Sequence, residues 1–217
     1  MRMPSALTVT GDVHIGQFHS VALAVDDEIN ADSMAVLRKV DPRFQPVSSP
    51  LDTRKVMRYV LQVGQQEPFS VDVLCPLRGP IRESVTTLRS FRGGAQVIKH
   101  LDFLLYLEVN AAVLHGPGIP VNVPAPERYA VHKLLLSEMR IDTPRSQTKA
   151  IKDHKQADML IRVLSNDRPN DLEEAWREMR DRGPSWRLKA DRAVARLPAD
   201  TRAIMQGMTA PSTAPEV

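Results

Sequence analysis

The spacing of hydrophobic and polar positions changes about half-way along the chain. In the first half, short runs of β-branched and other apolar residues lie between turns rich in glycine and proline, a pattern typical of β-strands. One helix is expected within this half, over residues 28–40. The predicted strands cover residues 7–9, 21–25, 56–63, 70–75, 101–107, 111–114 and 119–123.

From Pro124 onward, apolar residues recur at the spacing of α-helices. Two helices are predicted over residues 126–139 and 147–165. A third is predicted to begin with a capping box of Asp171 and Glu174 and to end at Gly183-Pro184, before a fourth that carries Trp186. The composition of residues 198–217, rich in Pro, Ser, Thr and Ala, indicates a flexible tail.

These patterns predict a chain of the α/β (α+β) class. We expect a core with a mixed β-sheet over residues 1–124, a helical bundle over residues 125–197 and a flexible tail over residues 198–217. The apolar runs are shorter than the ~18–20 residues that a membrane span requires. The first ten residues lack the apolar stretch of a secretory signal. A cytoplasmic protein that does not contact a membrane is therefore expected.

Charge and cysteine content narrow the class further. The 217 residues include 29 Lys and Arg against 26 Asp and Glu, which gives a formal net charge of +3. This small excess favours an ordinary soluble surface over a nucleic-acid-binding one. The single cysteine, Cys75, excludes an internal disulfide framework and a cysteine zinc site, and it fits a reducing cytoplasm.

Three side chains in the first half are candidates for a metal site. Asp12 and His14 are two residues apart, so in an extended segment their side chains share one face. Asp72 lies between two valines of a predicted strand, where a carboxylate is costly to bury without a cation or a donor. Carboxylates that meet at adjacent strand ends suit Mg²⁺ in phosphoryl or nucleotidyl transfer. A turn carboxylate that caps the backbone and an edge-strand carboxylate that faces solvent remain the alternative.

Several segments resemble the nucleotidyltransferase superfamily with the DNA polymerase beta-type fold. Residues 10–15 (TGDVHI) resemble its T-x-D-[IV]-D-[IL] strand, and residues 70–77 (SVDVLCPL) resemble the V-D-L-L-x-P strand that supplies a third carboxylate. Residues 123–134 (VPAPERYAVHKL) and 149–157 (KAIKDHKQA) are similar to the P-x-P-x-R-[FY]-A-x-H-K-L and K-x-x-K-D-x-x-Q-A helices of an uncharacterised bacterial branch. The abortive-infection nucleotidyltransferase toxins have comparable lysine and lysine–aspartate elements.

This resemblance implies a metal-dependent transfer of a nucleoside monophosphate from an NTP to an acceptor hydroxyl, on RNA, tRNA or a protein, in a toxin–antitoxin-like setting. Asp12 and Asp72 would be the catalytic carboxylates, with His14 as the further metal ligand. The implied cofactor is Mg²⁺, with Mn²⁺ as the alternative. Lys133 would bind phosphate, supported by Arg128, Lys152 and Asp153.

The sequence departs from the family pattern at two places. His14 replaces the second aspartate of the Asp-x-Asp pair, and an imidazole suits Mn²⁺ or Zn²⁺ better than Mg²⁺. The family's Gly-Ser motif, upstream of the first aspartate, has no counterpart in the eleven residues before Asp12. The alternative is therefore a catalytically impaired relative, or a shortened fragment, that binds a nucleotide or a partner protein without turnover.

Two charged residues of the predicted helices need partners. Asp153 lies on the apolar face of its helix, so Lys133 or Arg140 is expected to pair with it. Such an ion pair is compatible with a structural or a functional role. Lys133 itself could also pack its stem and extend its ammonium group to solvent.

Overall fold

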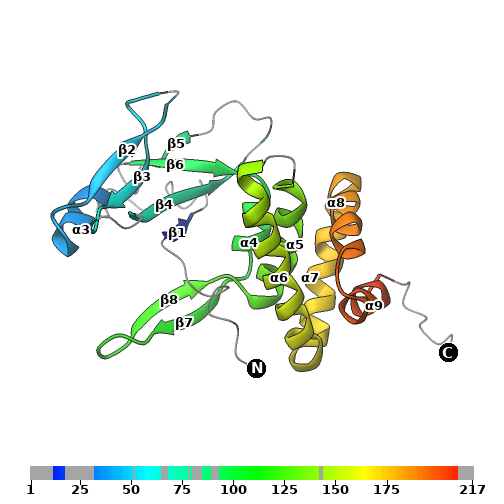
Figure 1. Ribbon diagram of the computed structural model, residues 1–217. Coiled ribbons are helices and arrows are strands. Elements are labelled where there is room, and N and C mark those ends of the chain that lie inside the picture. Colours follow the sequence, from blue (N-terminus) through cyan, green and yellow to red (C-terminus); the bar gives the residue numbers. More distant parts are fainter. Residues whose placement is uncertain are drawn as a thin grey trace. The chain divides into compact units, whose positions relative to one another are not determined.

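The computed structural model describes residues 12–17, 32–50, 52–64, 68–77, 79, 85–88, 93–141 and 144–209 (Figure 1). The chain forms two compact units. The sheet unit is Val9–Leu105, and the helical unit includes Tyr106–Val217. This division lies before residue 124, and the predicted domain boundaries stay a prediction. The strands predicted over residues 7–9 and 21–25, and the beginning of the helix predicted over residues 28–40, lie outside the described residues.

The sheet unit contains one mixed sheet, which confirms the predicted fold class. Its central strand, β4, pairs in parallel with β1 and β6 and antiparallel with β3. The main order is β2-β3-β4-β6-β5, with β1 attached to β4. The strands are β1 (Asp12–Gly16), β2 (Gln45–Ser48), β3 (Val56–Leu61), β4 (Phe69–Pro76), β5 (Val85–Leu88) and β6 (Gly93–Ile98).

The central strand is buried on both of its faces. Val71, Val73 and Cys75 contribute one face to the hydrophobic core, while Ser70 and Asp72 are buried on the other face. Core packing therefore fixes β4, and with it the position of a buried carboxylate. The other core residues of this unit are Phe44, Tyr59, Leu88 and Ala95.

Within its described residues, the sheet unit contains helices α3 and α4. α3 (Ser33–Val40) begins at Asp32, whose side chain accepts hydrogen bonds from the amides of Met34 and Ala35. The strand predicted over residues 101–107 is wrong, because Leu101–Leu105 forms helix α4. An apolar run this short has no period that separates a strand from a buried helix. α4 also explains Gly16, since a Cβ there would lie 2.6 Å from Cδ2 of Leu105.

Strands β2, β5 and β6 are absent from the sequence prediction. β2 contains Pro46, which an edge strand tolerates because that residue needs no ladder donor. β6 begins with Gly93-Gly94, a pair that suggests a turn rather than a strand. Gly94 is required there by close packing, since a Cβ would lie 1.9 Å from the carbonyl oxygen of Val56.

The described part of the helical unit consists of a β-hairpin followed by helices. The sequence predicts the strands of this hairpin, but as part of the sheet core over residues 1–124. β7 and β8 form a two-stranded antiparallel sheet, and α5 packs against α6, α7 and α8 (Figure 1). α5 is buried over much of its surface, with Ala130, Val131, Leu134 and Leu135 among its buried residues. The elements are β7 (Val109–Val113), β8 (Ile119–Val123), α5 (Pro126–Met139), α6 (Pro144–Asp167), α7 (Pro169–Asp181), α8 (Pro184–Ala195) and α9 (Ala199–Gly207).

Two details of the helical prediction are corrected. The N-cap of α7 is Arg168 without a side-chain cap, because Pro169 occupies the first helical position and Asp171 lies within the first turn. Residues 199–207 of the predicted tail form helix α9, which buries Thr201 and Met205. Oγ1 of Thr201 donates to Asp158 on α6, and Met205 is buried in the core, so tertiary contacts order a segment whose composition suggests a tail. Residues 210–217 of the predicted tail lie outside the described residues.

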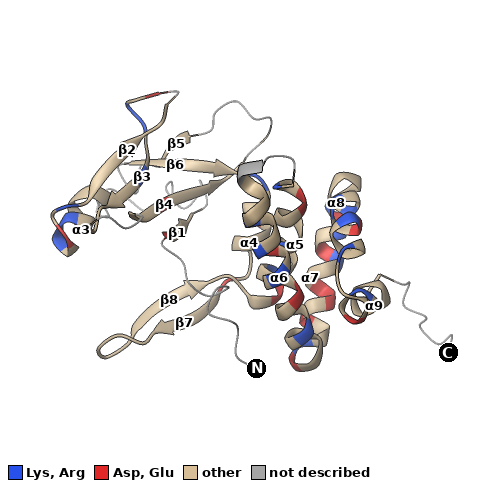
Figure 2. Cartoon of the chain, in the orientation of Figure 1, with Lys and Arg blue, Asp and Glu red and all other residues tan. Residues whose placement is uncertain are grey.

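Charged side chains of both signs alternate over the helices of this unit (Figure 2). Several form pairs one helical turn apart, such as Glu173 with Arg177 and Glu178 with Arg182. Within the part of the chain that the structure describes, none of the helices has the length and apolar character needed to cross a membrane.

Candidate metal-binding site

Strands β1 and β4 bring the three predicted metal ligands together. Their parallel register places His14 opposite Asp72 and Asp12 opposite Ser70. Nε2 of His14 lies 3.5 Å from Oδ2 of Asp12 and 3.4 Å from Oδ2 of Asp72. One ligand atom from each of the three residues lies within 4.8 Å of the others. We call these residues the Asp-His-Asp cluster.

Asp72 is the buried member of the cluster, with 2% of its side chain exposed. Arg58 on β3 donates two hydrogen bonds to this carboxylate, from Nε to Oδ1 at 2.7 Å and from Nη2 to Oδ2 at 2.9 Å. Nε2 of Gln96 on β6 donates to Oδ1 at 3.0 Å and also to the carbonyl oxygen of Met57. Side chains from β3 and β6, the strands that flank β4, therefore orient the Asp72 carboxylate.

The charge state of Asp72 follows from these contacts. Burial by itself raises the pKa of the carboxyl group, but the hydrogen bonds with His14 and Arg58 more than offset it and hold the pKa below its usual value. Asp72 is therefore a carboxylate at neutral pH. The cluster presents two carboxylates and an imidazole, a donor set that fits a divalent first-row cation.

Arg58 and Gln96 are the members of this site that sequence reasoning misses. The strand signal over residues 56–63 contains Arg58, and an arginine in a half-buried strand needs an acidic partner. That signal could have linked it to Asp72, since Tyr59 pairs with Val71 and the register carries on to these two residues. No sequence pattern indicates the role of Gln96, because Gly93-Gly94 suggests a turn where strand β6 begins.

The predicted phosphate-binding residue Lys133 belongs to the helical unit. Its Nζ donates to Oδ1 of Asp153 at 2.6 Å, and Nη1 of Arg140 donates to Oδ2. The expected pairing of Asp153 is therefore confirmed, with both of the cations considered. Nζ of Lys133 also lies 5.2 Å from the ring centre of Tyr129. This arrangement ties α5 to α6 around a buried carboxylate.

The other two supporting residues occupy different environments. Arg128 is buried on α5, donates through Nη1 and Nη2 to Glu178 on α7, and lies 4.8 Å from the ring centre of Tyr106. Nη2 of Arg182 donates to the same Glu178 carboxylate at 3.1 Å. Lys152 is half-buried on α6, next to Asp153. Arg128 thus joins α5 to α7.

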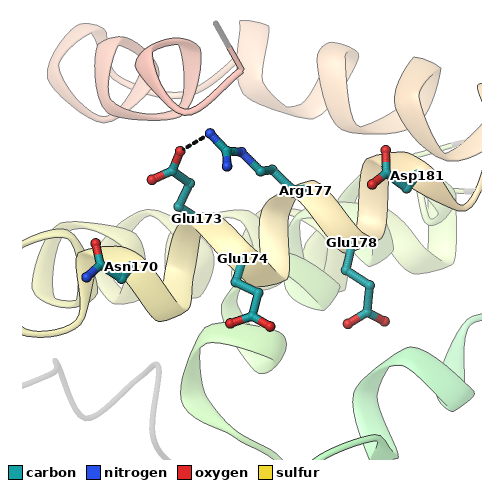
Figure 3. A pocket seen from close by; sticks show the side chains of 6 residues that line it. All are labelled: Asn170, Glu173, Glu174, Arg177, Glu178 and Asp181. Atoms are coloured by element: carbon teal, nitrogen blue, oxygen red, sulfur yellow. Dashed lines mark ion pairs between the residues drawn. The ribbon is translucent and has the colours of Figure 1, made fainter. Parts of the chain in front are cut away.

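A shallow hollow runs along α7 in the helical unit (Figure 3). Arg177 is the basic residue in its lining, and it pairs with Glu173 at 2.5 Å. An acidic lining of this kind repels phosphate groups, so the hollow does not suit a nucleotide. The residues that line it are Asn170, Glu173, Glu174, Arg177, Glu178 and Asp181.

Comparison with protein families gives one match that covers most of the chain. A family model described as nucleotidyltransferase matches residues 1–181. The matched segment contains the Asp-His-Asp cluster and the helices that carry Lys133 and Asp153, and it ends where α7 ends. Comparison with curated proteins and with solved structures gave no match.

Proposed function

The chain belongs to the nucleotidyltransferase family, and we propose that it transfers a nucleoside monophosphate from an NTP to an acceptor hydroxyl with a divalent cation in the Asp-His-Asp cluster. One observation carries the proposal. Two strands far apart in sequence bring a ligand atom from each of three residues within 4.8 Å, in a chain that the family model matches.

We propose a different role for each residue of the cluster. Asp12, His14 and Asp72 would hold a divalent cation, which would supply positive charge against the substrate phosphates. Asp72 would supply a ligand whose orientation is held by Arg58 and Gln96. Asp12 and His14 are more exposed and supply the ligands that face an incoming nucleotide. We propose separately, for the helical unit, that Lys133 binds a phosphate, with Arg128, Lys152 and Asp153 in support.

The cation we propose is Mg²⁺, with Mn²⁺ as the stronger-binding alternative. The imidazole of His14 brings no negative charge and is a softer ligand than the carboxylate that it replaces, and nitrogen ligands favour Mn²⁺ over Mg²⁺. The likeness to abortive-infection toxins supports an RNA or a protein as the acceptor. The low cysteine content, with Cys75 as the single cysteine of the sequence, supports a cytoplasmic location.

The test is transfer of label from each NTP to total tRNA or to protein, with Mg²⁺ or Mn²⁺. We expect labelled acceptor with the wild-type chain and none with Asp12→Asn or Asp72→Asn. The matched control is Asp41→Asn, which removes a carboxylate of the same unit that pairs with Arg43 outside the cluster. It should leave transfer unchanged.

A second function is favoured by one specific observation. Arg58 occupies both oxygens of Asp72, and His14 brings no negative charge. A chain with this cluster could bind a nucleotide without turnover. Unchanged NTP and unlabelled acceptor, together with measurable NTP binding, would replace the transferase proposal by this one.

A further inference from the structure

We infer that Arg58 is a positioning residue that competes with the divalent cation for Asp72 and thereby sets the metal affinity of the Asp-His-Asp cluster. The inference rests on the proposed function, because it assumes that this cluster binds a metal. It concerns a residue on β3, outside the strand motifs that carry the family resemblance.

The contacts of Asp72 create the competition. The guanidinium of Arg58 donates one hydrogen bond to each carboxylate oxygen, at 2.7 Å and 2.9 Å. This two-point geometry is the one in which arginine binds a carboxylate most strongly. The amide of Gln96 shares one of the same oxygens. Arg58 and Gln96 thus use both acceptor sites of Oδ1 and one of Oδ2, so a cation that binds Asp72 competes with Arg58 for the charge of this carboxylate.

Burial decides which partner moves. Asp72 is 2% exposed and lies on the central strand, so it cannot leave the cluster without disturbing the core. The side chain of Arg58 is 41% exposed, so solvent can receive its guanidinium. Arg58 is therefore the mobile partner, and Asp72 is the fixed ligand for which the two cations compete.

Charge adds to the competition. Asp12, Asp72 and Arg58 together carry a formal charge of −1, whereas the two carboxylates alone carry −2. A divalent cation beside the guanidinium is repelled by it. In the metal-free protein, Arg58 supplies the counter-ion that a buried carboxylate requires. The same residue therefore stabilises the free cluster and opposes metal binding.

The experiment is a Mn²⁺ titration of the full chain, followed by the electron paramagnetic resonance signal of free Mn²⁺ and by calorimetry. Arg58→Gln should tighten Mn²⁺ binding about tenfold or more, since the competent form is then no longer a minor fraction. Arg58→Lys keeps the charge but loses the fork geometry, so its affinity should lie between those of Arg58→Gln and wild type.

The matched control is Arg54→Gln. Arg54 is 90% exposed and pairs with Asp52 at 3.1 Å, outside the cluster. Its removal changes the net charge by the same amount as Arg58→Gln, so any non-local effect of charge appears in both variants. Mn²⁺ affinity of Arg54→Gln should equal that of wild type.

The folding of each variant is checked by circular dichroism, because Arg58→Gln removes the counter-ion of a buried carboxylate. Should that variant unfold, Arg58→Lys decides the question. Equal Mn²⁺ affinities for Arg54→Gln and the folded Arg58 variants would overturn the inference.

The same titration separates this inference from the proposed function. Mn²⁺ binding by wild type with no gain in the Arg58 variants overturns the role of Arg58 and leaves the metal site standing. Absence of binding in every variant overturns both. Tighter binding in Arg58→Gln, together with no label transfer by the wild-type chain, supports the role of Arg58 and overturns the transferase.

Discussion

At the scale of single residues, His14 would decide which cation the proposed metal site prefers. It pairs across the strands with Asp72 and lies within 3.5 Å of Oδ2 of Asp12, so it occupies a ligand position between two carboxylates. An aspartate at this position would supply a hard oxygen donor and a further negative charge, both of which Mg²⁺ favours. The side chain is 52% exposed, so a shorter residue fits without a buried cavity.

We therefore expect His14→Asp to increase Mg²⁺ affinity about tenfold, measured by calorimetry on the folded chain. The preference for Mn²⁺ over Mg²⁺ should fall at the same time. His115→Asp, in the exposed turn between β7 and β8, introduces the same charge in the helical unit and should leave the affinity unchanged. If His14→Asp changes neither the Mg²⁺ affinity nor the Mn²⁺ affinity, a metal site formed by these residues is contradicted.

At the scale of elements, the carboxylate of Glu178 holds α7 to α5. Burial by itself raises the pKa of Glu178, but hydrogen bonds with Arg128 and Arg182 outweigh this effect and keep the pKa below its ordinary value. A lowered pKa in the folded state means that the ion pairs contribute stability above the unfolded pKa of about 4.3. That contribution is lost as the pH falls through the lower, folded-state pKa.

Glu178→Gln should lower the free energy of unfolding by about 2 kcal/mol at pH 7, since it leaves the buried Arg128 without its counter-ion. Urea unfolding between pH 7 and pH 3 should show the difference from wild type shrinking as the pH falls. Glu173→Gln on the same helix removes an exposed pair with Arg177 and should cost less than about 0.5 kcal/mol. A pH-independent difference for Glu178→Gln would contradict the ion-pair explanation.

The elements also show where prediction from the sequence succeeds and where it stops. Helices α5 and α6 and strands β3 and β4 have long or clearly bounded apolar patterns, and their predictions are confirmed. The predictions are wrong for residues 101–105 and miss the strand at residues 93–98, for different reasons. The first segment is too short to reveal a period, and in the second Gly94 meets a steric need at Val56 that only tertiary packing creates.

The same limit applies to the candidate site. The sequence predicts that Asp12, His14 and Asp72 form one metal site. The pairing of β1 with β4 confirms that these side chains lie close together. Arg58 is the counter-ion of Asp72, and this pairing can be recognised only when the register of β3 against β4 is known. A charged residue inside a predicted strand is therefore the signal to look for when a buried carboxylate lacks a counter-ion.

At the scale of the whole molecule, the family match and the compact units divide the chain differently. The match ends at residue 181, with α7, but the packing of the helical unit continues beyond it. α8 packs against α5, and Nη1 of Arg196 lies 2.5 Å from Oε2 of Glu138. Ala190, Ala193 and Leu197 are buried. α8 and α9 are therefore part of the fold of this unit and not an appendage.

A chain that ends at Asp181 should consequently lose the packing partner of α5 and unfold at a lower temperature than wild type. We expect a decrease in Tm of 10 °C or more, roughly what the loss of several buried side chains costs, measured by circular dichroism. A chain that ends at Thr209 keeps α9 and the hydrogen bond from Nε1 of Trp176 to Thr209, and should melt like wild type. If the two shortened chains melt alike, the conclusion that α8 and α9 complete this unit is wrong, and the matched segment would be sufficient for folding.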